Sequence, residues 1–205
     1  MPVTREQIVA AALDLLDEAG LDGLTLRQLA GRLGIRAPTL YWHVRDKREL
    51  LDLLAAAIMD EALARWRAPQ PGQPWWEWLA TRARVMRAAL LAHRDSALVV
   101  SGNRPAESSL PGIERQLRAL ADAGFAPRDG LLALLTLNAY VIGDVIDQQA
   151  EGQQPRPAEA EPAALVPDGP YPLIQAATRE LSSPDQRFEH GLEVLITGLR
   201  SRHSG

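Results

Sequence analysis

The stretch that decides the fold is GIRAPTLYWHV, residues 34–44. Its apolar residues Leu40 and Val44 lie four positions apart, so on a helix they share one face. The opposite side and the flanks carry polar and aromatic residues, namely Pro38, Thr39, Tyr41, Trp42 and His43. A solvated face rarely needs such residues, whereas a surface that docks on a flat, polar, anionic partner does. We therefore predict a very short helix that reads DNA.

The composition indicates an all-α globular protein. The chain has 205 residues, of which 46% are apolar and 23% charged, and few of them are β-branched. We expect no membrane partner, because no apolar run approaches the roughly 20 residues of a membrane span. Five charged residues within positions 5–18 argue against a signal peptide. The absence of cysteine excludes disulfides and thiolate metal sites and fits a cytoplasmic location.

The charges are unevenly distributed. The net charge is −4, yet residues 27–48 hold six basic side chains against the single acid Asp46. Residues 144–168 show the reverse, with six acids against Arg156. A basic patch near the start of an acidic chain indicates one small surface that meets phosphate, although a solvated charge cluster is the alternative.

The first 46 residues predict a three-helix bundle with a helix-turn-helix. Thr4 with Gln7 and Thr25 with Gln28 have the spacing of capping boxes, and Gly20 is placed to end the first helix in a left-handed C-cap. A glycine turn then leads into the short helix described above. This spacing is typical of a helix-turn-helix, although many helical hairpins share it.

Residues 47–205 predict a larger helical domain. Asp46 caps a long helix that ends near Trp66 and connects the two parts, and a proline-rich break follows at 68–74. Further helices are expected at about 75–92, 95–101, 110–123, 128–150, 171–181 and 185–200, with a flexible loop at about 151–170. The helices at 128–150 and 185–200 carry apolar stripes that fit a homodimer interface, with packing inside one subunit as the alternative.

Several short runs of residues together carry a family resemblance: Leu33-Gly34-Ile35, Pro38 to Val44, Lys47-Arg48, Leu50-Leu51-Asp52, Ala89-Leu90-Leu91, His93-Arg94-Asp95, Gly102, Arg104-Pro105, Gln116-Leu117, Gly124-Phe125, Phe188 and Gly191-Leu192-Glu193. With these runs the chain resembles the TetR family of bacterial repressors, in particular its tetracycline-repressor branch. The resemblance spans nearly the whole chain. It implies a homodimer with two DNA-binding heads that leaves a palindromic operator when a small molecule binds the C-terminal domain.

The predicted DNA contacts follow from side-chain chemistry. Arg27 and Arg36 can donate to guanine edges or phosphates, and Thr39 can contact a thymine methyl or a phosphate. The other expected contacts are Pro38, which fixes the start of the helix, Tyr41, His43 and Lys47, which donate to phosphates, and Trp42, which packs on sugar and backbone. His43 has an alternative role at the edge of the core. Ala37 departs from the family, which has a longer amide there, so we expect Arg36 to read a different operator.

The effector site departs further from the tetracycline repressors. The resemblance places Val100 where they have a magnesium-binding histidine, and valine offers no lone pair to a metal. It also places Leu63 and Arg82 at polar ligand-binding positions and Met86 at a phenylalanine, while Gln116 is kept. We therefore expect no metal, no cofactor and no tight binding of magnesium–tetracycline. The expected site is an apolar cavity with few polar anchors, lined by Leu63, Arg82, Met86, Val100, Asn103, Arg104, Gln116, Leu131, Leu134, Asn138 and Asp147.

Two other classes of function compete with a ligand-responsive repressor. An enzyme is not expected, because the four histidines are scattered and neither a catalytic triad nor a phosphate-binding glycine loop is recognisable. A helical binding or scaffold protein with a vestigial DNA-binding head is the remaining alternative. Sequence preference and salt-dependent affinity for DNA would separate that scaffold from a repressor.

Overall fold

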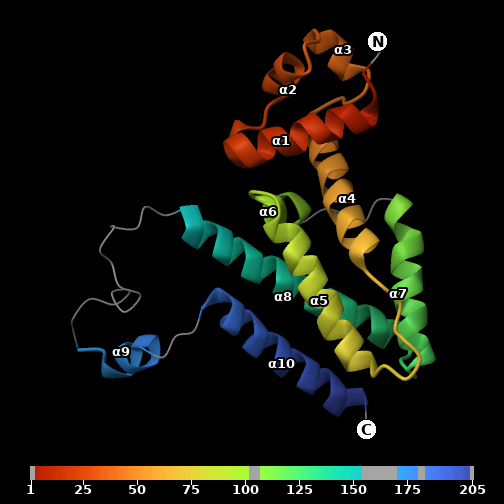
Figure 1. Ribbon diagram of the computed structural model, residues 1–205, viewed down its shortest axis with the longest axis vertical. Helices are drawn as coiled ribbons and strands as arrows, with labels where there is room; N and C mark the ends of the chain where they lie inside the picture. Colours follow the sequence, from red (N-terminus) through yellow and green to blue (C-terminus); the bar gives the residue numbers. More distant parts are fainter. Residues whose placement is uncertain (1–2, 102–106, 154–169, 180–182, 204–205) are drawn as a thin grey trace.

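The computed structural model describes residues 3–101, 107–153, 170–179 and 183–203, and all regular secondary structure in these ranges is helical, as the sequence predicts (Figure 1). The N-terminal helices form a small unit, here called the head: α1 (Arg5–Gly23), α2 (Leu26–Arg32) and α3 (Ala37–Tyr41). The connecting helix is α4 (Lys47–Arg65). The remaining elements form the body: α5 (Trp75–Leu91), α6 (Ser96–Val100), η1 (Glu107–Ser109), α7 (Leu110–Asp122), α8 (Pro127–Gln153), α9 (Pro172–Arg179) and α10 (Pro184–His203).

The helices of the head begin at the predicted caps. Thr4 and Gln7 form the complete capping box of α1. At α2 only half of the predicted capping box forms. The Thr25 hydroxyl accepts a hydrogen bond from the Gln28 backbone N–H, but the Gln28 side-chain oxygen accepts from the Thr25 hydroxyl and not from the Thr25 backbone N–H. Gly20 has the predicted positive φ of 72°, but its ψ of 179° makes a kink, and helix resumes to Gly23. The kink lets the end of α1 turn against the body.

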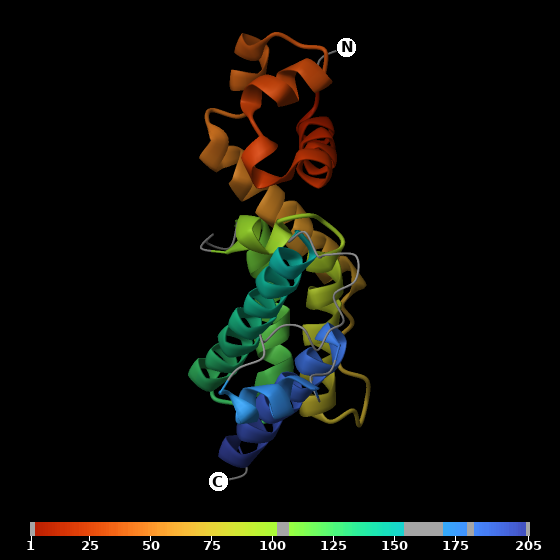
Figure 2. The same ribbon diagram turned by 90° about the vertical axis from the view of Figure 1, so that its left-hand side faces the viewer.

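Helix α4 runs from the head into the body, where α5 and α6 pack against it (Figure 1). In the second view, α8 and α10 lie side by side on the face of the body turned toward the viewer (Figure 2). Buried side chains of α8, among them Leu137, Val141 and Val145, join one core with those of the other helices. The core is therefore continuous from the head through α4 to the body.

Helix α8 corrects two sequence expectations. It extends through residues 151–153, so the expected loop at 151–170 begins later, and residues 154–169 of that loop lie outside the described ones. By length and hydropathy α8 could also cross a membrane, contrary to our expectation, because residues 130–143 carry no charge. Core helices of soluble proteins meet the same criteria, and this one packs against α5, α6, α7 and α10.

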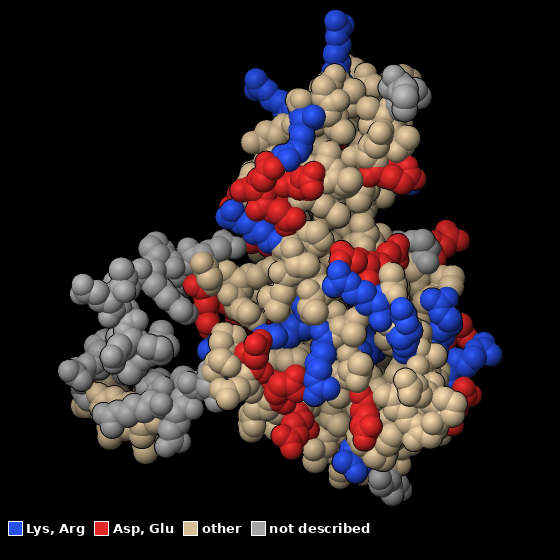
Figure 3. All heavy atoms as spheres, in the orientation of Figure 1, with Lys and Arg blue, Asp and Glu red and all other residues tan. Residues whose placement is uncertain are grey.

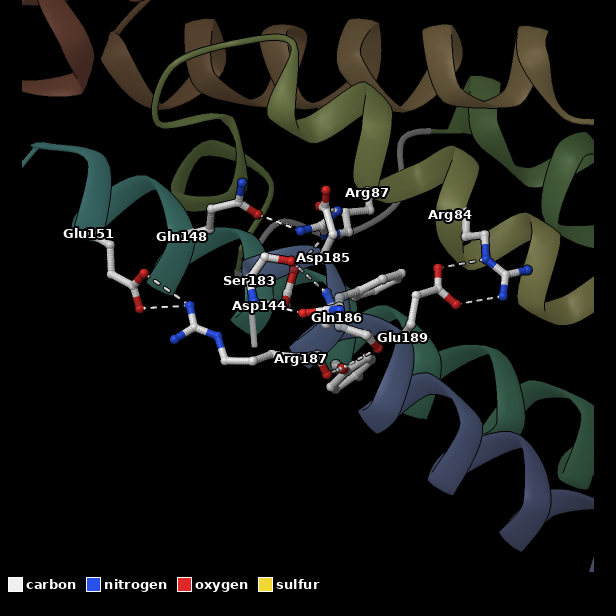
Figure 4. Close-up of polar contacts among 12 residues, drawn as sticks. Arg84, Arg87, Asp144, Gln148, Glu151, Ser183, Asp185, Gln186, Arg187 and Glu189 are labelled. Atoms are coloured by element: carbon white, nitrogen blue, oxygen red, sulfur yellow. Dashed lines mark hydrogen bonds and ion pairs between the residues drawn. The ribbon is translucent and has the colours of Figure 1, made fainter. Parts of the chain in front are cut away.

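A buried arginine holds three helices of the body together (Figure 4). From α5, Arg87 donates to Asp144 of α8 at 2.7 Å, to Asp185 of α10 at 2.7 Å and to Gln148 of α8 at 2.6 Å. Its guanidinium also lies 4.6 Å from the centre of the Phe188 ring. The Arg87 side chain is 10% exposed and that of Asp144 is 14% exposed, so this pair is largely shielded from water.

The substitution Arg87→Met is expected to lower the free energy of unfolding by about 3 kcal/mol, because it leaves the Asp144 carboxylate buried without its partner. The matched control is Arg84→Met on the same helix, which breaks a half-exposed ion pair with Glu189 and should cost less than about 1 kcal/mol. Urea unfolding at one fixed protein concentration measures both values. Equal losses in the two variants would show that Arg87 is not the main tie between the helices.

Candidate functional sites

The short helix α3 is fixed by its apolar side and presents its polar side outward. Leu40 is 1% exposed and Val44 is fully buried, whereas Tyr41 is 52% and Trp42 is 89% exposed. Arg36, Ala37, Pro38 and Thr39 at the start of the helix are also exposed, and His43 is half-buried. The structure thus exposes the polar side of α3 and the residues at its start, while Arg27 lies on α2 and Lys47 begins α4.

The basic side chains of the head differ in whether they are already paired. Arg32 lies 2.5 Å from Glu18, Arg45 lies 3.0 Å from Glu49, and Arg48 lies 3.2 Å from Asp52. Lys47 donates to the Leu21 carbonyl at 3.0 Å. Arg27 and Arg36, by contrast, are exposed and have neither an ion pair nor a hydrogen bond from their side chains among the described residues.

Figure 3 shows that basic and acidic side chains occupy different parts of the head surface. In this view basic side chains project from the outer end of the head, where Figure 1 places α2 and α3, and acidic side chains gather nearer the body. An anionic partner is therefore attracted to the outer end of the head. The two unpaired guanidinium groups can bind phosphates or guanine edges without first breaking an ion pair.

A polar junction joins the head to the body. Asp17 of α1 accepts from the Arg94 amide and contacts His93 Nδ1, both at 2.9 Å, and His93 Nε2 lies 3.3 Å from Glu61 of α4. The Leu21 amide donates to Asp95 at 2.9 Å. The junction therefore links the last turns of α1, the C-terminal part of α4 and the segment between α5 and α6.

The body holds a small cavity between α4, α5 and α7. Its volume is about 20 Å³. Four of its lining residues were predicted, namely Leu63, Arg82, Met86 and Gln116, and four were missed, namely Met59, Ala62, Trp66 and Val85. Helical spacing could have found the missed residues, because positions 59, 62, 63 and 66 share one face of α4 and Val85 lies three residues after Arg82.

Arg82 is the polar centre of this cavity. It is 8% exposed, its Nε donates to the Gln116 side-chain oxygen, and its Nη2 donates to the Asn138 side-chain oxygen at 2.9 Å. Its Nη1 is buried and has no partner among the described residues. Burial lowers the pKa of Arg82 to about 10, so the group remains a cation at neutral pH.

The other expected effector residues do not line this cavity. Leu134 is buried in the core, and Val100 is partly buried against it at the end of α6. Leu131 and Asp147 are exposed on α8 and do not line the cavity within one chain, so their role at the effector site stays a prediction. Asn103 and Arg104 lie outside the described residues.

The residues of the cavity do not fit a magnesium ion. Magnesium prefers oxygen ligands, chiefly carboxylates and water, and the cavity lining contains neither a carboxylate nor an imidazole. The buried cation Arg82 would also repel a second cation. Elsewhere in the described part of the chain, no group of three or more histidine, aspartate or glutamate side chains could hold a metal.

Comparisons with known proteins cover almost the whole chain. Residues 8–54 match the family described as bacterial regulatory proteins, tetR family, and residues 68–203 match the tetracyclin repressor-like C-terminal domain. The class D tetracycline repressor protein of Escherichia coli is 43% identical over 96% of this chain and 89% of its own length.

Solved structures agree with these matches. The class A repressor in complex with 5a,6-anhydrotetracycline and magnesium is 36% identical, with a TM-score of 0.73 over 97% of this chain and 99% of its own. ActR of Streptomyces coelicolor in complex with actinorhodin is 29% identical, with a TM-score of 0.85 over all of both chains. These two relatives bind differently named ligands, so the shared fold does not identify the ligand.

The junction predicts a pH-dependent contribution to stability. Burial lowers the pKa of His93, but its hydrogen bonds and charge interactions with Asp17 and Glu61 raise it further, so the net pKa lies above 6.5. The charged imidazole therefore stabilises the fold at pH values below the unfolded pKa of about 6.5, and this contribution is lost as the pH rises through the folded pKa. The free energy of unfolding of the wild type should exceed that of the His93→Gln variant by the largest amount at pH 5.5 and by the smallest amount at pH 8.5.

The control for this prediction is His190→Gln, because His190 is exposed on α10. Denaturant unfolding of the wild type and both variants at pH 5.5, 7.0 and 8.5 gives the comparison. A difference between wild type and His93→Gln that stays constant or grows with pH would contradict the prediction.

Proposed function

The chain belongs to the TetR family of ligand-responsive DNA-binding repressors, and we propose that it binds a palindromic operator as a homodimer and leaves it when a small molecule other than magnesium–tetracycline binds. The single observation that carries the DNA half is the pair of exposed guanidinium groups of Arg27 on α2 and Arg36 at the start of α3, which have no ion pair among the described residues. Residues 1–46 would be the DNA-binding domain, and residues 47–205 the effector-binding and dimerisation domain.

Each residue predicted to contact DNA has a proposed role. Arg36 reads bases at the edge where Ala37 is too short to do so, and Arg27 binds a base or a phosphate. The remaining contacts position the head on the backbone: Pro38, Thr39, Tyr41, Trp42, His43 and Lys47. Lys47 can serve in this way because its contact with the Leu21 carbonyl uses one of its three donors.

A second copy of the chain is the proposed partner of α8 and α10. On α8, Leu131, Leu132 and Leu135 are 41%, 46% and 53% exposed, and Val194 on α10 is 58% exposed. Apolar surface that adjoins the core of a body is typical of an obligate interface. Burial of this face in a dimer would also account for the high hydropathy of α8 without a membrane.

The lining of the cavity supports an effector that needs no metal. Leu63, Met86 and their apolar neighbours provide hydrophobic contact, while Arg82 and Gln116 provide polar groups. The relatives named above are regulators and not enzymes, and we propose the same for this chain, with a cytoplasmic location.

In vitro selection from random double-stranded DNA is the experiment that tests this function. We expect an inverted repeat whose affinity falls steeply as salt rises, because phosphate contacts release counterions. In a gel-shift assay, Arg36→Ala and Tyr41→Ala should each weaken binding to this repeat by about tenfold or more. Circular dichroism confirms that the variants are folded.

The matched control is Arg65→Ala, which removes one positive charge from an ion pair with Glu61, at the far end of α4 from the head. It should leave the affinity for DNA unchanged. If no sequence preference emerges from the selection, a helical scaffold with a vestigial head becomes the better description.

Tetracycline with magnesium should bind this chain about a hundredfold or more weakly than it binds the class A repressor, because a ligand to the metal is replaced by Val100 and the cavity carries a cation. Fluorescence titration of both proteins under the same conditions provides the measurement. Tight binding that is abolished by a magnesium chelator would contradict this prediction.

A further inference from the structure

Two arginines of α5 are buried to the same degree but have different partners. Arg87 is 9% exposed and contacts two carboxylates, those of Asp144 and Asp185. Arg82 is 8% exposed, and the acceptors of its described hydrogen bonds are the neutral side chains of Gln116 and Asn138. Removing a cation from water without an anionic partner is costly, so Arg82 carries an electrostatic cost that Arg87 does not.

The geometry around Arg82 leaves a donor free for a ligand. The side-chain oxygens of Gln116 and Asn138 accept from Nε and Nη2 and so hold the guanidinium plane in place. Nη1 is buried without a partner among the described residues, and so is the indole nitrogen of Trp66, which lines the same cavity. Two buried donors without partners are unfavourable, so a ligand that brings a hydrogen-bond acceptor would be stabilised here. A negatively charged acceptor would also offset the charge of Arg82.

The rest of the cavity requires an apolar ligand. Met59, Leu63, Val85 and Met86 line it, and methionine side chains adapt readily to a ligand's shape. The present volume of about 20 Å³ has room for little more than a water molecule, so a ligand must displace side chains. Trp66 also lines a second, open hollow of about 480 Å³, so its ring borders both spaces.

We propose that the effector is an apolar organic anion whose carboxylate or phenolate group binds Arg82, with Trp66 as the second donor. This proposal rests on the proposed function, because it specifies the ligand of the same site. It also places the ligand against the connecting helix, since Trp66 is the C-terminal cap of α4. A ligand bound by Trp66 therefore contacts the end of the helix that carries the head.

Matched pairs of probes test the charge requirement. The pairs are 2-naphthoate with 2-naphthamide and anthraquinone-2-carboxylate with its carboxamide, which differ mainly in the negative charge. Binding is followed by tryptophan fluorescence and by the melting temperature of the ligand-free and ligand-bound protein. At least one acid should bind about tenfold or more tightly than its amide, and this preference should disappear in Arg82→Gln.

The matched control is Arg84→Gln, which removes an exposed cation from the same helix and should keep the preference for the acid. Arg82→Lys keeps the charge but loses the guanidinium fork, and should retain part of the preference. Arg82→Gln should remain folded, because it breaks no ion pair, and its melting temperature verifies this. Equal affinity for acids and amides, failure of both acids to bind, or an unchanged preference in Arg82→Gln would overturn the proposal.

The same samples separate this proposal from the proposed function. Operator affinity is measured by gel shift with and without each probe. If the operator is bound and a neutral molecule releases it, the repressor function holds and the anion requirement fails. If acids bind through Arg82 but no operator is bound, the anion site holds and the repressor function fails.

Discussion

The burial of α4 (Lys47–Arg65) is the constraint on which the rest of the structure depends. Leu50 and Leu54 are fully buried and Ile58 is 1% exposed, and α4 packs against α1 in the head and against α5 and α6 in the body. Each buried Leu or Ile contributes roughly 2 kcal/mol, so the head cannot separate from this helix without losing part of the common core. A displacement of α4 at the body is therefore transmitted to the head.

The polar junction limits the ways in which the head can move. Asp17 holds the His93 ring and the Arg94 amide, while Asp95 holds the Leu21 amide. A side chain at Gly20 would come within 2.8 Å of an Asp95 oxygen and would be strained at the φ of 72°, so glycine favours this close approach. With apolar contacts along α4 and hydrogen bonds at the end of α1, the head has two points of attachment, and a relative motion must rearrange at least one of them.

Much of the fold could be predicted from local signals, whereas the effector site could not. Caps, glycines and helical periodicity act within a few residues, which is why the helices begin close to the predicted positions and why Leu40 and Val44 were recognised as core. Arg82 is hydrogen-bonded to Gln116 and Asn138, which lie 34 and 56 residues further along the chain, and no local pattern reveals these partners. Family resemblance supplied positions such as Leu131, whose 41% exposure on α8 depends on what covers this face and not on any local pattern.

The contrast between Arg82 and Arg87 explains how one helix can serve both stability and ligand binding. Arg87 satisfies its charge within the chain and ties α5 to α8 and α10, so its contacts favour a single arrangement of the body. Among the described residues Arg82 has only neutral hydrogen-bond partners, so the fold bears the cost of its charge in the absence of an anion. A ligand that offsets this cost stabilises the arrangement of the body to which it binds. Because its binding energy then differs between two arrangements, it can shift the protein from one to the other, as a ligand-controlled switch requires.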